Sequence, residues 1–222
     1  MRRRLLDIYE RLFAAYGPQG WWPGDSPFEV IVGAILTQNT AWTNVEKAMA
    51  NLRAAHVLTP AGLLELTAEE IAPLIRPAGY FNAKARKLRA FVEFLAQGHG
   101  GDLNSLWAME TAPLRETLLG IHGVGPETAD SILLYAAGRP AFVVDAYTRR
   151  VFSRLGLVSD TVGYRDLQAL FVEHLPPDVP LFNEYHALVV RHGKECCRKR
   201  QPTCDVCPLR AGCAYTPGSG NA

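Results

Sequence analysis

The sequence predicts an all-α protein, and three observations lead to this fold class. Apolar residues recur at the three- and four-residue spacing of helices along most of the 222 residues. Convincing runs of alternating apolar and polar residues, the pattern of a half-buried strand, do not occur in the sequence. The composition, 48% hydrophobic and 20% charged, is that of an ordinary globular protein. At about 100–200 residues per domain, the length allows one large domain or two small ones.

The N-terminal segment is the first predicted helix. Its apolar residues fall on one helical face: Leu5, Leu6, Ile8, Leu12 and Phe13. The basic start resembles a secretion signal, but Asp7, Glu10 and Arg11 interrupt the apolar stretch that a signal requires. No apolar run approaches the roughly 18 residues of a membrane span. We therefore expect no membrane partner and a cytoplasmic location, associated with the nucleoid in a prokaryote.

The next segment is apolar on nearly all sides, which predicts a buried helix over Pro27–Gln38 with its proline in the first turn. A buried strand over residues 30–36 is the alternative, but the pattern continues through Thr43–Leu52 and is long enough to favour a helix. Thr67 and Glu70 form a capping-box pattern that opens a short helix. Further helices are predicted over Asn82–Ala96, Thr111–Leu119, Glu127–Ala137, Asp145–Leu155, Tyr164–Leu175 and Leu181–His192.

The charges of the chain nearly cancel. A net charge of +1, from 23 Lys+Arg against 22 Asp+Glu, excludes a uniformly basic nucleic-acid coat and an acidic disordered chain. The basic residues nevertheless concentrate in Lys84–Arg89 and Arg191–Arg210. This distribution favours a local DNA-facing surface.

A glycine-rich turn separates two of the predicted helices. We expect Gly123 and Gly125 to accept a positive φ and to allow a close backbone approach, while Val124 anchors the turn. The helix that follows, with Thr128 near its start, offers free N–H groups that suit a phosphate, and His122 lies beside the turn. The pattern is typical of a helix–hairpin–helix that grips one DNA strand. An ordinary corner between two packed helices is the alternative.

Asp145 follows an apolar run and precedes a helix. In isolation, this position is first of all that of an N-cap. The same position keeps the carboxylate ionised, because the helix N-terminus stabilises negative charge. An ionised carboxylate is what glycosidic-bond cleavage needs, since the sugar develops oxocarbenium character and water must be activated. The residue is therefore a candidate catalytic group.

Four of the five cysteines follow the spacing Cys-x6-Cys-x2-Cys-x5-Cys, at Cys197, Cys204, Cys207 and Cys213. Four thiolates in so short a segment can hold a [4Fe–4S] cluster or zinc. Zinc ribbons usually use two Cys-x2-Cys pairs, and only one occurs here, which favours the cluster. Cys196 is expected to be a bystander, although it could replace its neighbour as a ligand.

Together, the hairpin, the aspartate about twenty residues after it and the cysteine spacing resemble the endonuclease III superfamily of DNA glycosylases, over residues 21–215. The resemblance implies a six-helix barrel domain with the hairpin over residues 21–138. It also implies an iron–sulfur cluster domain built from residues 1–20 and 139–222. Such a protein is expected to be a monomer that binds double-stranded DNA in a cleft between the domains and flips a damaged nucleotide into it.

The sequence departs from the bifunctional members of that superfamily at one position. They carry a catalytic lysine two residues after the second hairpin glycine, where this chain has Glu127. Without that amine no Schiff base can form there, so strong lyase activity is not expected. Lys84, Lys87 or Lys194 could substitute only by entering the cleft. The resemblance thus favours a monofunctional glycosylase that uses Asp145.

Several motifs resemble the 3-methyladenine DNA glycosylase III group, among them Trp-Trp-Pro at residues 21–23 and the glutamate just named. Aromatic residues suit a flipped cationic base, because cation–π attraction adds to stacking. The substrate-binding residues that the resemblance implies are Trp21, Trp22, Pro23, Trp42, Gln38, Asn39, Glu127 and Lys194. Of these, the amides at 38 and 39 are candidates to fill the gap that the flipped base leaves, with helix-end capping as their alternative role.

Two other functions stay open at this point. One is an endonuclease III-like glycosylase for oxidised pyrimidines or mismatched bases. The other is a non-catalytic DNA-binding scaffold that has kept the fold. The aromatic residues and Glu127 weigh against the oxidised pyrimidines, and the retained Asp145 weighs against the scaffold.

Overall fold

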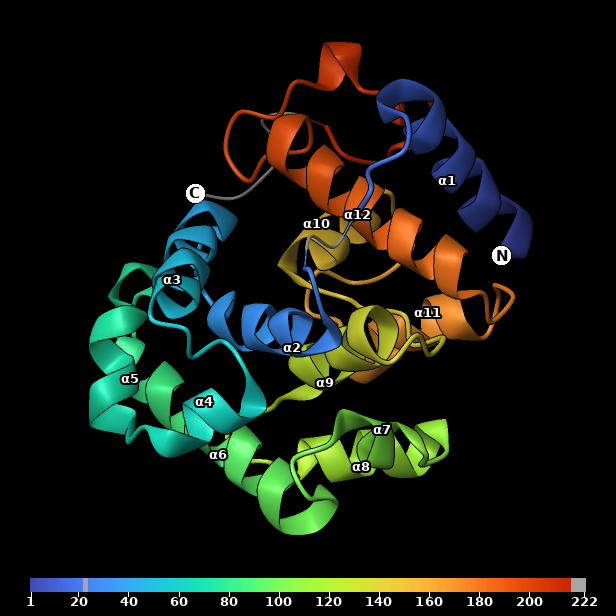
Figure 1. The fold of residues 1–222 in the computed structure, drawn as a ribbon. Helices are drawn as coiled ribbons and strands as arrows, with labels where there is room; N and C mark the ends of the chain where they lie inside the picture. The colour runs from blue at the N-terminus through green and yellow to red at the C-terminus, as the bar shows by residue number, and fades with distance from the viewer. Residues whose placement is uncertain (22–23, 217–222) are drawn as a thin grey trace. The chain divides into compact units, whose positions relative to one another are not determined.

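A computed structural model describes residues 1–21 and 24–216, and all regular secondary structure within these ranges is helical (Figure 1). The all-α prediction is confirmed. None of the described helices is both long and apolar enough to cross a membrane. The chain divides into two compact units, called unit 1 (Met1–Trp21 and Pro140–Ala222) and unit 2 (Trp22–Arg139).

Unit 2 is built around α2 (Pro27–Leu36). This helix contacts α3 (Trp42–Ala54), α6 (Phe81–His99), α9 (Pro126–Ser131) and the π-helical turn η2 (Ile132–Ala136). This segment is an α-helix, so the alternative of a strand over residues 30–36 is wrong. All of its residues except Pro27 and Glu29 are buried, as expected. The helix begins there because the Ser26 hydroxyl accepts a hydrogen bond from the Glu29 N–H and Pro27 occupies the first turn. The other elements of unit 2 are α3 (Trp42–Ala54), α4 (Pro60–Glu65), α5 (Ala68–Leu74), η1 (Arg76–Ala78), α6 (Phe81–His99), α7 (Leu103–Trp107), α8 (Thr111–Leu119), α9 (Pro126–Ser131) and η2 (Ile132–Ala136).

Some bounds in unit 2 differ from the sequence-based expectation. The pattern from Pro27 onwards breaks over residues 37–41, where the chain leaves α2 and starts α3 anew. The capping box at Thr67 is present in both directions, with its hydroxyl and the Glu70 carboxylate each bonded to the other's backbone N–H. The short helices α4 and α7 were not predicted, because five or six residues carry too little periodicity. The predicted helix over Glu127–Ala137 turns into a π-helix halfway.

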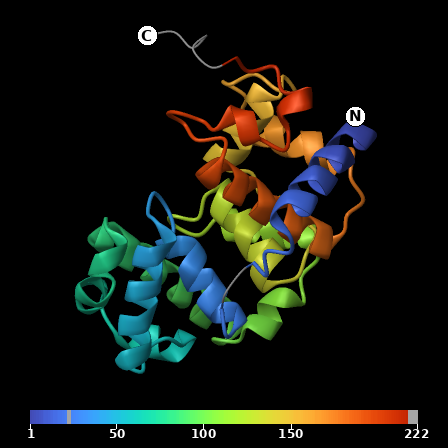
Figure 2. The same ribbon diagram turned by 90° about the horizontal axis from the view of Figure 1, so that it is seen from above.

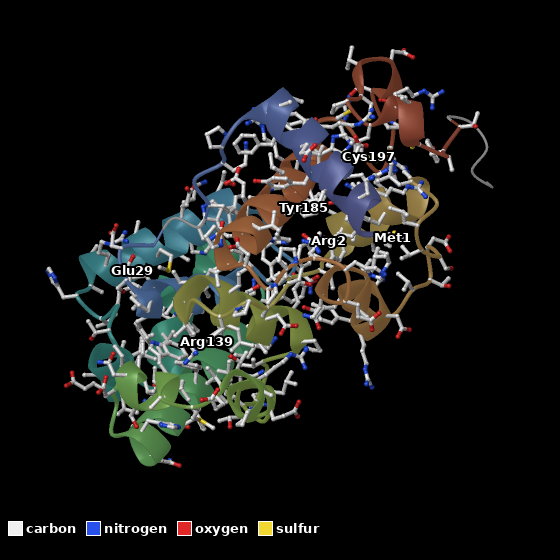
Figure 3. All side chains as sticks on the ribbon, turned by 90° about the vertical axis from the view of Figure 1, so that its right-hand side faces the viewer. Met1, Arg2, Glu29, Arg139, Tyr185 and Cys197 are labelled. Atoms are coloured by element: carbon white, nitrogen blue, oxygen red, sulfur yellow. The ribbon has the colours of Figure 1, made fainter. Side chains whose placement is uncertain are left out.

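Unit 1 joins the two ends of the chain through one aromatic core. The helix α12 (Val179–Glu195) packs against α1 (Arg2–Tyr16) and α10 (Ala146–Arg154), as Figures 1 and 2 show. The remaining α-helix described in unit 1 is α11 (Tyr164–Val172). Tyr185, labelled in Figure 3, donates its hydroxyl to the Leu5 carbonyl at 2.8 Å. The buried rings around it are Phe142, Phe152, Phe171 and Phe182. Phe142 precedes α10 by four residues and Tyr185 directly precedes His186 on α12, so this core positions the two helices that carry the candidate site of unit 1.

Candidate functional site

Asp145 is the N-cap of α10, and the run before it explains its position. Phe142, Val143 and Val144 are at most 1% exposed, so this segment is anchored in the core and delivers the aspartate to the helix start. The Oδ1 atom of Asp145 accepts hydrogen bonds from the Thr148 N–H at 2.7 Å and from its hydroxyl at 2.9 Å. The capping role expected from the sequence is therefore present, and it engages one carboxylate oxygen.

The second oxygen, Oδ2, lies 3.6 Å from Nε2 of His186, whose side chain is buried on α12. Burial by itself raises the pKa of Asp145. The His186 ring and the two Thr148 donors outweigh that effect, so the pKa lies below its ordinary value. The Asp145 side chain is 14% exposed, so an ionised carboxylate keeps an opening to the surface. No local signal in the sequence marks His186 as a partner of the aspartate, because the two residues lie on different helices.

Trp21 and Lys194, both predicted to bind substrate, lie together in unit 1. The Lys194 Nζ atom is 5.7 Å from the Trp21 ring centroid and 5.9 Å from that of Tyr147, which follows Asp145 by two residues. The Trp21 ring also meets His186 edge-on, with centroids 6.5 Å apart. Gly193 is required here, because a Cβ at this position would stand 2.6 Å from a Tyr147 ring atom. Trp22 and Pro23, predicted to belong to the same pocket, lie outside the described residues.

The hairpin lies in unit 2, and its two glycines differ. Gly123 has a φ of +83°, as expected, whereas Gly125 is extended at −93°, so the expectation of a positive φ is wrong there. A Cβ on Gly123 would stand 2.3 Å from the Lys87 Cγ, so the lysine stem lies directly on this glycine. Val124 and Thr128 are buried, Gly123 is half-buried, and His122, Gly125 and Glu127 are exposed. The turn is thus anchored by its valine and threonine, while the remaining residues reach the surface.

Gln38 is bound to this hairpin. Its amide donates to the Gly123 carbonyl at 3.1 Å and to the Thr128 hydroxyl at 2.9 Å, and its oxygen accepts from Lys87. To fill a gap in DNA, this side chain would have to leave three hydrogen bonds. Its neighbour Asn39 is exposed with a φ of +53°, and of the two amides it is the one that faces solvent.

A second loop is clamped to the Gln38 segment. Buried Lys84 donates to the carbonyls of Leu36 and Ala78, each at 2.8 Å, and the Thr40 hydroxyl donates to the Ala78 carbonyl at 2.7 Å. Burial lowers the pKa of Lys84 to about 8, with repulsion by Lys87 adding to the effect. Because Lys84 is committed to this clamp, and Lys87 to Gln38, neither amine is placed to form a Schiff base.

Tyr80 is an exposed aromatic residue that lies two residues after the clamped Ala78 and directly before α6. Its side chain is 75% exposed and its φ is +46°, a backbone conformation that costs a non-glycine residue about 1–2 kcal/mol. No sequence signal had singled it out.

Trp42, predicted to bind substrate, is half-buried at the start of α3 and donates its indole N–H to Glu46 at 3.1 Å.

The cysteine-rich loop follows α12 in unit 1, where Figure 3 labels Cys197. The four predicted ligands line one small apolar cavity. The other residues around it are Val151, Arg154, Leu155, His192, Cys196, Pro202, Leu209, Arg210 and Tyr215. Four thiols that face a common apolar cavity fit a [4Fe–4S] cluster, whose ligands are cysteine thiolates. The donor atoms that lie nearest to one another, within 4.8 Å, are those of His192, Cys196 and Cys207, a trio that the sequence interpretation had not considered.

Comparison with known proteins gives three kinds of likeness. The sequence model of the family "HhH-GPD superfamily base excision DNA repair protein" matches residues 32–177. The chain is 46% identical over 210 residues to the "Putative DNA repair glycosylase" of Methanocaldococcus jannaschii, covering 94% of this chain and 95% of the relative. It is 32% identical over 189 residues to endonuclease III of Sulfolobus acidocaldarius, covering 85% and 82%. Among solved structures, H. pylori 3-methyladenine DNA glycosylase bound to 1,N6-ethenoadenine matches with a TM-score of 0.74 and 25% identity, covering 86% of this chain and 97% of the other.

Proposed function

The chain belongs to the HhH-GPD superfamily of base excision DNA repair proteins, and from this membership we propose that it is a monofunctional DNA N-glycosylase that removes an alkylated purine, 3-methyladenine above all. The observation that carries the proposal is the setting of Asp145. Its carboxylate is held ionised beside His186 and stays partly accessible. The position of the lyase lysine is filled by Glu127, and Lys84 and Lys87 are engaged elsewhere.

The reaction follows from this carboxylate. The N-glycosidic bond breaks with its electron pair moving to the base, and positive charge develops on the sugar at C1′. Asp145 stabilises that charge and takes a proton from the water that attacks C1′, which gives the free base and an abasic site. A 3-methyladenine base is cationic in DNA and leaves as a neutral molecule, so it needs no general acid. One carboxylate is sufficient for this chemistry.

Selection of a cationic base is the role proposed for Trp21 and Tyr147. Their rings already accommodate one cation, the Lys194 ammonium, at distances typical of cation–π contacts. Because Lys194 is exposed, its ammonium can turn into water when a cationic base takes its place over the rings. A neutral base gains only the stacking part of this attraction.

Residues of unit 2 are proposed to hold the DNA. The exposed backbone around His122, Gly123 and Gly125 suits a phosphate contact. Tyr80, exposed on a loop with a strained backbone, suits a side chain that inserts between base pairs while a nucleotide is flipped. Asn39 is the better placed of the two amides to reach the gap left by the flipped base.

In the cysteine cavity, we propose Cys197, Cys204, Cys207 and Cys213 as the ligands of a [4Fe–4S] cluster. When bound, such a cluster cross-links the loop, and a structural role is the simplest one. The chain's own residues secure the same loop, because Arg150 and Arg154 of α10 bind its backbone carbonyls.

An excision panel tests the function. Duplexes with 3-methyladenine, thymine glycol or mismatched bases are incubated with the purified protein, and released bases are identified by mass. Release of 3-methyladenine without borohydride trapping of the protein on DNA is the expected result.

The second candidate, a glycosylase for oxidised or mismatched pyrimidines, is favoured by the 32% identity to endonuclease III. Release of thymine glycol with a trapped covalent adduct would replace the proposal by this candidate.

A further inference from the structure

His192 is a buried imidazole of unit 1 that the proposed reaction does not use. It lies in the last turn of α12, is 1% exposed, and lines the same cavity as the four predicted cysteine ligands. Its backbone carbonyl accepts the N–H groups of Cys196 at 2.9 Å and Cys197 at 2.8 Å, so the cysteine-rich loop starts directly from this residue. A polar ring buried this deeply needs partners for both of its nitrogens.

Each nitrogen of the His192 ring has such a partner. The Nδ1 atom lies 2.9 Å from the hydroxyl of Tyr16, the last residue of α1. The Nε2 atom lies 3.8 Å from the Sγ atom of Cys207, a hydrogen-bond distance for the large sulfur atom. A hydroxyl, an imidazole and a predicted ligand sulfur therefore form one continuous chain of polar groups.

Tyr16 is fixed at its end of this chain. Its backbone carbonyl accepts hydrogen bonds from the Arg191 guanidinium at 3.0 Å and from the Gln19 amide at 3.2 Å. The same guanidinium lies 5.0 Å from the centroid of the tyrosine ring, at a distance typical of cation–π contacts. The tyrosine is thus held from its backbone and from its ring face, and its hydroxyl meets the histidine in a defined place.

The chemistry of a bound thiolate determines the direction of the chain. A cysteine that ligates a cluster has lost its proton, so the sulfur of Cys207 can only accept a hydrogen bond. The Nε2 atom of His192 must then carry the ring proton. Burial disfavours a charged imidazole, and in a neutral ring the other nitrogen is an acceptor. The Tyr16 hydroxyl must therefore donate to Nδ1, which selects this tautomer.

The neighbouring thiols have other partners. Cys196 donates its thiol to the Thr203 carbonyl at 3.4 Å. The sulfur of Cys197 faces the Arg154 guanidinium at 3.3 Å. The Nε2 proton of His192 is therefore directed at Cys207 without competition from these two sulfurs.

We propose that His192 donates a hydrogen bond to the Cys207 thiolate and thereby raises the reduction potential of the bound cluster, with Tyr16 as the positioning residue. The proposal rests on the cluster assignment made above and is independent of which base the protein removes. A hydrogen bond to a ligand sulfur stabilises the more negative, reduced state more than the oxidised state, so it raises the potential. The tyrosine acts through the histidine, because its hydroxyl keeps the ring proton on Nε2.

Voltammetry of the cluster-loaded protein measures the potential. Tyr16→Phe removes only the hydroxyl and should lower the potential, because the ring proton is no longer held on Nε2. His192→Phe should lower it further, by up to about tenfold in the oxidised-to-reduced ratio at a fixed voltage, which equals about 59 mV for one electron. His192→Gln, which keeps a donor of similar reach, should restore part of the difference. Tyr9→Phe is the matched control on α1, since this ring packs against Phe13 and Tyr185 and should leave the potential unchanged.

Iron and sulfide contents are measured on the same samples, so that a loss of cluster is not mistaken for a shift. If His192→Phe takes up no cluster, Tyr16→Phe decides alone, because it leaves both rings in place. A wild-type potential in a fully loaded Tyr16→Phe would overturn the positioning role, and the same result in His192→Phe would overturn the hydrogen bond. A protein that holds one zinc ion, lost in His192→Phe, would make the histidine a ligand and refute the proposal. Base release in the excision panel is a separate readout, so the glycosylase function stands or fails independently.

Discussion

The carboxylate Oδ2 of Asp145 lies 3.6 Å from Nε2 of His186, while Oδ1 is occupied by the two donors of Thr148. The two oxygens thus have separate tasks. One caps α10 and fixes the direction of the carboxylate. The other faces the buried imidazole ring, which together with Thr148 holds the group ionised despite its burial.

Asp145→Asn should abolish excision while the fold and DNA binding persist. Asparagine caps helices as well as aspartate does, so α10 keeps its first turn. The amide cannot take a proton from water or balance the charge on the sugar. We expect single-turnover excision to fall by a factor of about 10² to 10⁴. Binding to a tetrahydrofuran duplex, measured in parallel, should stay at the wild-type level, and equal excision by the variant would remove Asp145 from the mechanism.

His186→Phe should shift the acid limb of the pH–rate profile to higher pH. The ring lowers the pKa of Asp145, so its removal raises that pKa, and the carboxylate then becomes protonated at a higher pH as acid is added. Phenylalanine keeps the edge-on packing against Trp21. His186→Gln, which retains a hydrogen-bond donor, should move the limb less. A lower rate at all pH values with an unmoved acid limb would leave the histidine a packing role only.

Tyr80→Gly should separate stability from function. Glycine accepts a φ of +46° without strain, so thermal stability should stay equal or rise by up to about 1 kcal/mol. The ring that is proposed to enter the DNA stack is lost, and a base–aromatic stack is worth about 1–3 kcal/mol. Affinity for the abasic-analogue duplex should therefore fall about fivefold to 150-fold. Tyr80→Phe is the control that keeps the ring, and weak binding by this variant would point to the hydroxyl rather than to stacking.

Lys84→Met should destabilise unit 2 and remove a pH dependence of stability. The substitution leaves the Leu36 carbonyl without its buried donor and the Ala78 carbonyl with the Thr40 hydroxyl alone, at a cost of about 1–3 kcal/mol. The pKa of Lys84 is about 8 in the folded protein and 10.5 in the unfolded chain, so the unfolded chain binds more protons between these values. Wild-type stability should therefore rise with pH across this window relative to Lys84→Met. Urea denaturation at pH 7.5 and pH 10 measures both effects, and a constant difference would contradict the lowered pKa.

The helices were predictable where the signal is local. The range Thr111–Leu119 agrees with α8 at both ends, and the capping box at Thr67 is present, because periodicity and caps depend on residues within one or two turns. Asp145 was predictable for the same reason, since an apolar run followed by an N-cap residue is a local pattern.

The rest of the site depends on contacts between distant segments. His186 reaches Asp145 from α12, and Gln38 turns into the hairpin through hydrogen bonds to Gly123 and Thr128. Tyr80, with its positive φ, follows the loop that Lys84 and Thr40 hold by hydrogen bonds to the Ala78 carbonyl. No spacing rule encodes such partners, which are set by how the helices pack.

Substitution of single cysteines should show which residues of the loop bind the metal cluster. The spacing assigns Cys197, Cys204, Cys207 and Cys213, and leaves Cys196 as a bystander whose thiol donates to the Thr203 carbonyl. Cys196→Ser should then retain the yellow-brown colour and the iron and sulfide content of the wild type. Cys204→Ser should lose both, because a cluster of four irons needs a thiolate at each corner.

The geometry also defines the contrary outcome. His192, Cys196 and Cys207 bring their donor atoms within 4.8 Å of one another, a set that mixes nitrogen and sulfur as many zinc sites do. A colourless protein with one zinc ion, lost in Cys196→Ser and kept in Cys204→Ser, would replace the cluster by this trio. Metal analysis of the two variants, expressed and purified under the same anaerobic conditions, therefore decides between four cysteines and the histidine-containing set.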